Sequence, residues 1–261
     1  MSTPFIAIAL ILICWLPGAA RAEEIQPDRP ETTDSARLVP RGTYQLETGI
    51  TISRERRAGM TAEQTFGSEA VLRIGAAQNV ELNLEGEPFA LVLGPPDAFG
   101  PGDVTLGIRY RFVEGVEDDP WSPSFAVKPF VTLPVRGEPI GSGRVDFGLL
   151  LLGSVALPLD FELEANAGVA AIGQTGSSDF RPQGIVSASL SRDLAPFMFA
   201  FLEIAYTSRA QRDVREQLAL NTGLVYRVTP TFTLDAAVQT SLYGQGPDYL
   251  IRTGLSVRFG P

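Results

Sequence analysis

The stretch that decides the fold is YLIRTGLSVRF, residues 249–259 near the C-terminus. Two kinds of side chain alternate along it. Mostly apolar side chains fall at every second position, at Tyr249, Ile251, Thr253, Leu255, Val257 and Phe259. The positions between them carry Leu250, Arg252, Gly254, Ser256 and Arg258. Because successive side chains of a β-strand point to opposite faces, this period of two predicts a strand with one apolar face.

The same alternation recurs along the chain and predicts twelve strands. Their expected spans are 43–53, 65–74, 79–87, 102–112, 124–133, 144–157, 160–170, 183–192, 196–206, 216–227, 231–242 and 248–259. Most run to about 9–12 residues, the length a tilted strand needs to cross a bilayer. Strands of soluble sandwiches are commonly nearer about 5–6 residues.

The connections between these strands alternate in length. Short ones are expected at 75–78, 158–159, 193–195 and 228–230, and longer polar ones at 54–64, 88–101, 134–143, 171–182 and 207–215. Only the connection at 113–123 is long where a short one is due. Short periplasmic turns and long extracellular loops are typical of outer-membrane barrels. An even number of strands would place both termini on the periplasmic side.

The chemistry of the two strand faces favours a closed barrel. In lipid every backbone N–H and C=O must be paired within the protein, which a closed barrel permits and an open sheet does not. Charged side chains must then point inward, and the predicted lumen residues are Glu47, Glu69, Arg73, Glu81, Asn83, Glu85, Arg109, Arg111, Lys128, Glu162, Glu164, Asn166, Glu203, Asp235, Arg252 and Arg258. The expected fold is therefore an all-β antiparallel transmembrane barrel of about twelve strands over residues 43–261. A soluble antiparallel sandwich also alternates, and remains the alternative.

The N-terminus has the features of an export signal. An apolar run, FIAIALILICWL, is followed by Pro17 and Gly18 and then by Ala20-Arg21-Ala22. This order of apolar segment, helix breaker and A-x-A site predicts a signal peptide over residues 1–22, cleaved after Ala22. The opening MSTPF departs from the pattern because it has no Lys or Arg. Residues 23–42 would then form a periplasmic arm before the barrel.

Composition excludes several classes of function. The formal net charge of −9 argues against a nucleic-acid partner, which needs a basic surface. The 261 residues include no histidine, and the single cysteine, Cys14, lies in the predicted signal peptide. Histidine-based catalysis, disulfides and cysteine-ligated metals are therefore excluded from the mature chain. We expect no enzyme activity, no metal site and no cofactor.

Residues 25–49 read IQPDRPETTDSARLVPRGTYQLETG and resemble the opening of a known bacterial family. The shared features are Asp28-Arg29-Pro30, the turn Pro40-Arg41-Gly42, and a first strand ending in Gln45, Glu47 and Gly49. The family comprises outer-membrane transporters of Gram-negative bacteria and is named for the meta-pathway of phenol degradation. The resemblance implies an outer-membrane channel for passive uptake of small organic solutes, aromatic ones among them.

Several alternatives stay open at the level of sequence. The segment Asp28-Arg29-Pro30 either plugs the barrel base or remains a solvated arm. The lumen is either a channel or a closed, charge-paired interior of a structural barrel whose partners are lipid and lipopolysaccharide. Arg54, Arg56 and Arg57 either bind lipopolysaccharide phosphates or are merely solvated.

The facing of residues 194–206 is also open, because Phe197, Phe199 and Phe201 share a face with Glu203. Either one wall of the lumen is aromatic or the register is shifted there by one residue.

Overall fold

The computed structural model describes residues 24–56, 62–94, 97–116, 119–174, 176–211 and 215–260. The predicted signal peptide, residues 1–22, and Arg57 lie outside the described residues. Within the described ranges, no helix is long and apolar enough to cross a membrane.

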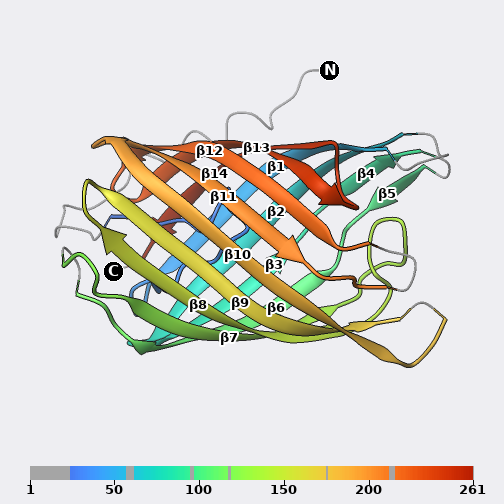
Figure 1. Cartoon of the computed structure of the whole chain (residues 1–261), viewed down its shortest axis with the longest axis horizontal. Coiled ribbons are helices and arrows are strands. Elements are labelled where there is room, and N and C mark those ends of the chain that lie inside the picture. Colours follow the sequence, from blue (N-terminus) through green and yellow to red (C-terminus); the bar gives the residue numbers. More distant parts are fainter. Residues whose placement is uncertain are drawn as a thin grey trace, which may run out of the picture.

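Antiparallel strands account for almost all of the regular structure (Figure 1). In chain order they are β1 (Tyr44–Glu55), β2 (Glu63–Ala77), β3 (Val80–Gly86), β4 (Ala90–Leu93), β5 (Ala98–Gly100), β6 (Val104–Val113), β7 (Ser124–Leu133), β8 (Asp146–Leu157), β9 (Phe161–Gly173), β10 (Phe180–Ala195), β11 (Met198–Thr207), β12 (Gln217–Thr229), β13 (Phe232–Gly244) and β14 (Tyr249–Phe259).

The sheet closes on itself because β1 pairs with the last strand as well as with its neighbour. Tyr44 of β1 lies opposite Phe259 of β14 on one side and opposite Ile74 of β2 on the other. From β2 the ring continues through β3 and β6, and then through β7 to β14 in sequence order. The result is a closed barrel of twelve antiparallel strands, which confirms the predicted fold.

The main difference from the predicted strands lies in residues 88–101, where a loop was expected. These residues contain β4 and β5, which pair with each other as a hairpin. The register explains why: β3 pairs with β2 only from Ala70 onward, so β3 leaves the first part of β2 unpaired on the edge away from β1. β4 takes that place, with Ala90 opposite Gly67. Elsewhere the predicted bounds fall within a few residues of the observed ones, and β7 runs over 124–133 as predicted.

The outer face of the barrel is apolar and exposed, whereas the buried side chains are largely polar. Ile108, Leu149, Leu202 and Ile251 are each 45–55% exposed. The largest fully buried side chains, by contrast, include Arg73 and Arg109. A soluble barrel would bury its apolar face, so this inverted arrangement favours the transmembrane interpretation.

Aromatic pairs on the outer face lie near both ends of the barrel. Tyr44–Phe259, Phe112–Phe125 and Phe197–Tyr226 lie near the end that carries the termini, with ring centres 5.7, 6.3 and 5.6 Å apart. Phe147–Phe180 lies near the opposite end at 5.1 Å. Aromatic girdles at the two interfaces of a bilayer have this placement.

The open question about residues 194–206 is answered by the pairing of β11. Glu203 and Phe201 are buried on the inner face, while Leu202 and Ile204 are exposed on the outer face. Phe197 precedes the strand and lies outside, against Tyr226. The register is therefore not shifted, and part of the inner wall is aromatic.

Candidate functional site: the barrel lumen

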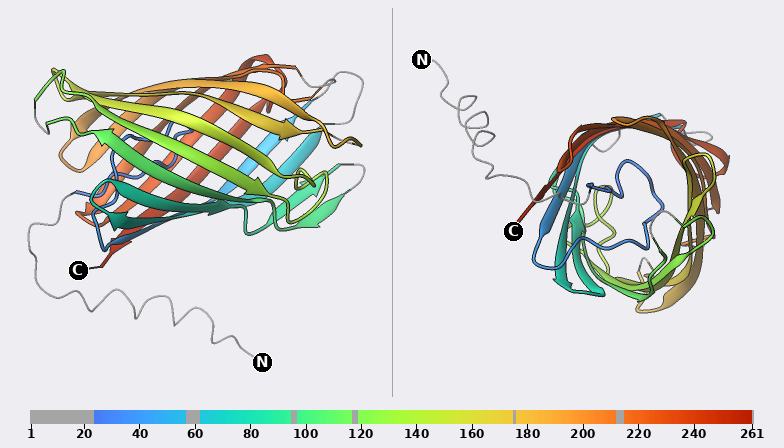
Figure 2. Two further views of the ribbon diagram at one scale, coloured as in Figure 1. Left: turned by 90° about the horizontal axis from the view of Figure 1, so that it is seen from below. Right: turned by 90° about the vertical axis from the view of Figure 1, so that its left-hand side faces the viewer.

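Residues 24–42, called the arm below, lie inside the ring of strands. The end-on view in Figure 2 shows this segment in blue within the barrel. Burial is deep at five points along it: Ile25, Arg29, Thr33, Ala36 and Val39 are all at most 5% exposed. The lumen is therefore occupied by the chain's own N-terminal segment.

One side of the lumen, formed by β2, β3, β6 and β7, holds buried cations, and we call it the cationic wall. Its cations are Arg73, Arg109 and Lys128, each at most 4% exposed. Asp28 of the arm lies 2.8 Å from Arg109 Nη2 and 3.2 Å from Arg73 Nη1. Asp34 lies 2.8 Å from Lys128 Nζ. Two carboxylates of the arm thus bind cations from three strands.

Wall carboxylates complete this network. Arg73 Nε lies 2.9 Å from Glu81, and its Nη1 lies 3.3 Å from Glu47. Lys128 also binds Glu85 at 2.6 Å. Each cation therefore bridges the arm and the wall, and removal of any partner leaves a buried charge partly uncompensated.

The environment of Asp28 stabilises its charged form. Burial by itself raises the pKa of this carboxyl, but the guanidinium groups of Arg109 and Arg73 outweigh burial and hold the pKa well below its ordinary value. The backbone N–H of Ser35 also donates to it, at 3.1 Å. Asp28 is therefore ionised under physiological conditions.

At the seam where β1 meets β14, the charges are reversed: Arg29 of the arm binds carboxylates of the wall. Its guanidinium binds Glu69 of β2 and lies 3.4 Å from Asp235 of β13. Gly49 and Gly254, which pair across the seam, leave the room that this side chain fills. A Cβ atom on Gly49 would lie only 2.3 Å from Arg29 Nη2. Here the arm supplies the cation and the wall the carboxylates.

The opposite side of the lumen, formed by β8 to β11, carries carboxylates and is called the acidic wall below. Glu203 accepts the backbone N–H of Thr33 at 2.6 Å and that of Thr32 at 2.9 Å. Asn166 holds both backbone groups of Asp34, accepting its N–H at 2.7 Å and donating to its carbonyl at 2.8 Å. This wall therefore binds the arm mainly through its backbone.

Glu31 of the arm faces this acidic wall and other carboxylates. Ser189 donates a hydrogen bond to it. Burial raises the pKa of the Glu31 carboxyl well above its ordinary value, and the negative charges of Glu164 and Glu203 raise it further. The environment of Glu31 therefore opposes ionisation, whereas that of Asp28, three residues earlier, favours it.

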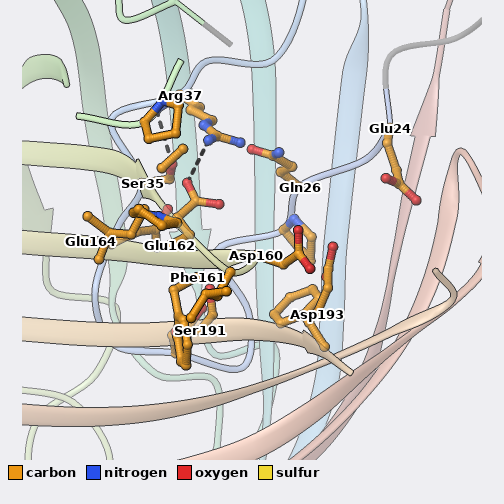
Figure 3. Close-up of a pocket in the computed structure, with 18 of the residues that line it drawn as sticks. Glu24, Gln26, Ser35, Arg37, Asp160, Phe161, Glu162, Glu164, Ser191 and Asp193 are labelled. Carbon is orange, nitrogen blue, oxygen red and sulfur yellow. Dashed lines mark hydrogen bonds and ion pairs between the residues drawn. The ribbon is translucent and has the colours of Figure 1, made fainter. Parts of the chain in front are cut away.

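A cavity of about 400 Å³ lies between the arm and the acidic wall (Figure 3). Arg37 of the arm reaches across it to Glu162 of β9 at 2.9 Å. Glu164, Phe161 and Asp193 also line it. We call this space the vestibule; it lies beside the turns that join β8 to β9 and β10 to β11.

The predicted lumen residues all lie on the inner wall, and most of them bind the arm. Those with a direct bond or ion pair to the arm are Glu47, Glu69, Arg73, Glu81, Arg109, Lys128, Glu162, Asn166, Glu203 and Asp235. Glu164 interacts with Ser35 and Glu31 of the arm. The remaining ones bind or adjoin other wall residues: Asn83 binds Glu81, Glu85 binds Lys128, Arg252 binds Glu69, Arg111 binds Glu114, and buried Arg258 lies beside Gln45.

The arm is longer than the predicted plug segment Asp28-Arg29-Pro30. Those three residues lie in the lumen, where Asn221 donates to the Pro30 carbonyl at 3.3 Å, but contacts extend to Val39. Ala36 packs against Ala126 and Leu152 of the wall. The sequence signal for this part was the run Thr32-Thr33-Asp34-Ser35, whose short polar side chains suit close packing with many hydrogen bonds.

Comparison with known proteins agrees with this geometry. Residues 27–259 match the family described as "Putative MetA-pathway of phenol degradation". An outer-membrane channel from Pseudomonas putida F1 is similar in structure, with a TM-score of 0.67 and 13% identity over 90% of this chain and 100% of that one. The NanC porin has a TM-score of 0.56 and 10% identity, over 80% of this chain and 98% of its own. At such identities the likeness shows the fold. No curated protein matches the sequence.

Proposed function

Because the chain belongs to the family described as "Putative MetA-pathway of phenol degradation", we propose that it is an outer-membrane channel for passive uptake of small organic solutes, aromatic ones among them. The observation that carries the proposal is a polar lumen with a water-accessible vestibule beside the docked arm. The signal peptide is cleaved after Ala22, and the mature protein needs no cofactor and performs no catalysis.

The outer face supports a location in the outer membrane. Its exposed apolar residues would be stabilised by lipid, and the aromatic pairs near both ends suit the two interfaces. Arg54 lies near the extracellular end of β1 and Arg56 directly follows that end, where both would be within reach of lipopolysaccharide phosphates. Lipid and lipopolysaccharide are the partners expected for such a surface.

The presence of the arm in the lumen favours a narrow route for solutes over a wide pore. A barrel of about twelve strands is wider than those filled by side chains alone, and narrower than open porins. Since the arm is held by buried ion pairs on the cationic wall, solutes would pass along the opposite, acidic side. The predicted lumen residues of that side, Glu162 and Glu164 among them, would line the passage.

A second candidate function is a closed structural barrel of the outer membrane. The observation that favours it is the number of strands that the arm binds: ion pairs and hydrogen bonds link it to β1, β7, β9, β11 and β13, among others. In that case the arm would serve as a permanent plug.

Planar-bilayer recording of refolded residues 23–261 separates the two candidates. A channel gives discrete conductance steps, and liposomes that contain it swell in small organic solutes. Heat-unfolded protein, checked by its migration on a detergent gel, is the control. A folded barrel that stays electrically silent and excludes such solutes from liposomes would reject the channel and leave the structural barrel.

A further inference from the structure

The vestibule has an excess of negative charge over positive charge. Its lining includes six carboxylates but only two cations, and all of these come from the arm, from β9 or from the adjoining turns and strand ends. The carboxylates are Glu24, Glu31, Asp160, Glu162, Glu164 and Asp193, and the cations are Arg37 and Arg227. The excess is a property of the vestibule as a whole and does not depend on one side chain.

Both cations of the vestibule are already bound to carboxylates. Arg37 lies 2.9 Å from Glu162. Arg227 lies 2.8 Å from Asp193 and 3.4 Å from Glu24. Hydroxyl groups hold two of the other carboxylates: Ser189 donates to Glu31, and Ser154 donates to Glu164 at 3.5 Å. Glu31 lies where neighbouring carboxylates oppose its ionisation, and Glu164 is one of those neighbours. Even without these two, the four carboxylates Glu24, Asp160, Glu162 and Asp193 outnumber the two cations, so the field in the vestibule remains negative.

The cations on the other side of the lumen do not offset this field. Arg73, Arg109 and Lys128 are almost fully buried, and each binds at least two carboxylates. A solute in the vestibule would therefore meet exposed negative charge, while the positive charge is both neutralised and sealed behind the arm. Carboxylates that line a narrow passage favour cations over anions.

The size and walls of the vestibule suit an organic cation. A volume of about 400 Å³ lies in the range of small-molecule sites. Its two aromatic rings each already hold a guanidinium: Arg192 lies 4.9 Å from the centre of Phe161, and Arg227 lies 4.9 Å from that of Phe199. Both rings are thus covered by the protein's own cations, and the case for a cationic solute rests on the carboxylates of the lining.

We propose that the vestibule makes the passage selective for cations, so that small protonated organic amines cross in preference to organic or inorganic anions. This inference rests on the proposed channel function and specifies the charge of its solutes. The selectivity arises where the arm narrows the lumen against the acidic wall, with Asp160 and Glu162 as the residues that determine it.

The test is the reversal potential of single channels under a tenfold KCl gradient, repeated with benzylammonium chloride and with potassium benzoate. We expect several-fold higher permeability for potassium than for chloride, and for benzylammonium than for benzoate. The double variant Asp160→Asn/Glu162→Gln should lower the cation-to-anion ratio at least about twofold while conductance persists. Glu138→Gln, which removes an exposed charge in the connection between β7 and β8, is the matched control and should leave the ratio unchanged.

The outcomes separate this inference from the proposed function. A silent barrel with normal heat-modifiable migration would reject the channel itself. A conducting channel that prefers anions, or a double variant that keeps the wild-type ratio, would overturn the cation selectivity and leave the channel intact. If the double variant fails to fold, the single variant Asp160→Asn, at an exposed turn residue, gives the same comparison.

Discussion

Asp28 and Glu31 are carboxylates on one buried segment, yet the two walls of the lumen shift their pKa values in opposite directions. Asp28 meets Arg73 and Arg109 of the cationic wall, whereas Glu31 meets Glu164 and Glu203 of the acidic wall. Burial is similar for both, so the difference comes from neighbouring charge. The comparison shows that ion pairs anchor the arm at the cationic wall, whereas the acidic wall binds it mainly through backbone hydrogen bonds.

The position of the vestibule follows from the same difference. Ion pairs hold the arm against the cationic wall, where the cations are almost fully buried. On the acidic side a cavity remains beside the arm. Each prediction below tests one part of this difference.

The largest effect is expected from Asp28→Asn, which removes the arm carboxylate that Arg109 and Arg73 share. Loss of one member of a buried ion pair typically costs about 3–5 kcal/mol. Here the cost falls on the free energy of docking the arm in the lumen. The readout is maleimide labelling of Ala36→Cys, since Ala36 is fully buried and Cys14 lies in the predicted signal peptide. Labelling should be much faster than in Ala36→Cys alone.

The exposed residue Asp179 provides the control for that experiment. Asp179→Asn removes the same charge from an extracellular connection and should not change the labelling of Ala36→Cys. Slow labelling in the Asp28→Asn protein would mean that the cationic wall does not anchor the arm.

A somewhat smaller effect is expected from Arg29→Met, because Arg252 still binds Glu69 after the change, at 3.3 Å. Asp235 loses its partner, and the expected loss is about 2–3 kcal/mol, toward the lower limit for a broken buried pair. The midpoint of heat-modifiable migration on detergent gels should fall. Adding Asp235→Asn should recover part of the loss, and a double variant no more stable than Arg29→Met would contradict the pairing.

The two carboxylates also predict opposite responses to pH. The raised pKa of Glu31 means that its contribution to stability is complete below its ordinary value of 4.5 and is lost as the pH rises through the folded-state value. The lowered pKa of Asp28 means that its contribution is present above 3.8 and is lost as the pH falls below that.

The test compares wild type with Glu31→Gln between about pH 5 and pH 9, because each unit of pKa difference corresponds to about 1.4 kcal/mol. The stability of wild type relative to the variant should decrease as the pH rises. A constant difference across this range would show that Glu31 does not meet the repulsion we describe.

The smallest effect is expected from Thr33→Val on the acidic wall. The Thr33 hydroxyl donates to Glu203 at 2.6 Å, but the carboxylate keeps two backbone donors and Asn221, which donates at 2.7 Å. The expected loss is about 1 kcal/mol, the value of one hydrogen bond. Thermal midpoints of Thr33→Val and of Thr33→Ser, which keeps the hydroxyl, measure it. Equal midpoints would show that this hydroxyl contributes nothing.

Strand alternation was enough to predict the ring and the inward charges, because period two is a local property. Residues 124–133 show this directly, since Lys128 falls on the inner face of β7. The partners of Asp28 were beyond such reasoning, because Arg73 and Arg109 come from β2 and β6, 36 residues apart in sequence, on either side of β3. Only insertion of the arm into the lumen brings Asp28 to them.

The packing of the arm could not be predicted from the sequence for a different reason. The run 147–152 is continuously apolar after Gly148, so alternation does not say that Leu152 faces the lumen and meets Ala36. The β4–β5 hairpin was missed because its segment is rich in Gly and Pro, and its strands form where β2 needs a partner. In both places, packing between segments distant in sequence outweighed the structure that the local sequence favours.

The central claim is that the arm stays in the lumen while solutes pass beside it, and a reversible cross-link tests this most directly. The Thr33 hydroxyl oxygen lies 2.9 Å from that of Ser187 of β10, so Thr33→Cys/Ser187→Cys should form a disulfide on oxidation. The account predicts complete cross-linking in membranes and unchanged conductance in the oxidised protein. Failure to cross-link, or conductance that disappears on oxidation and returns with reductant, would contradict it.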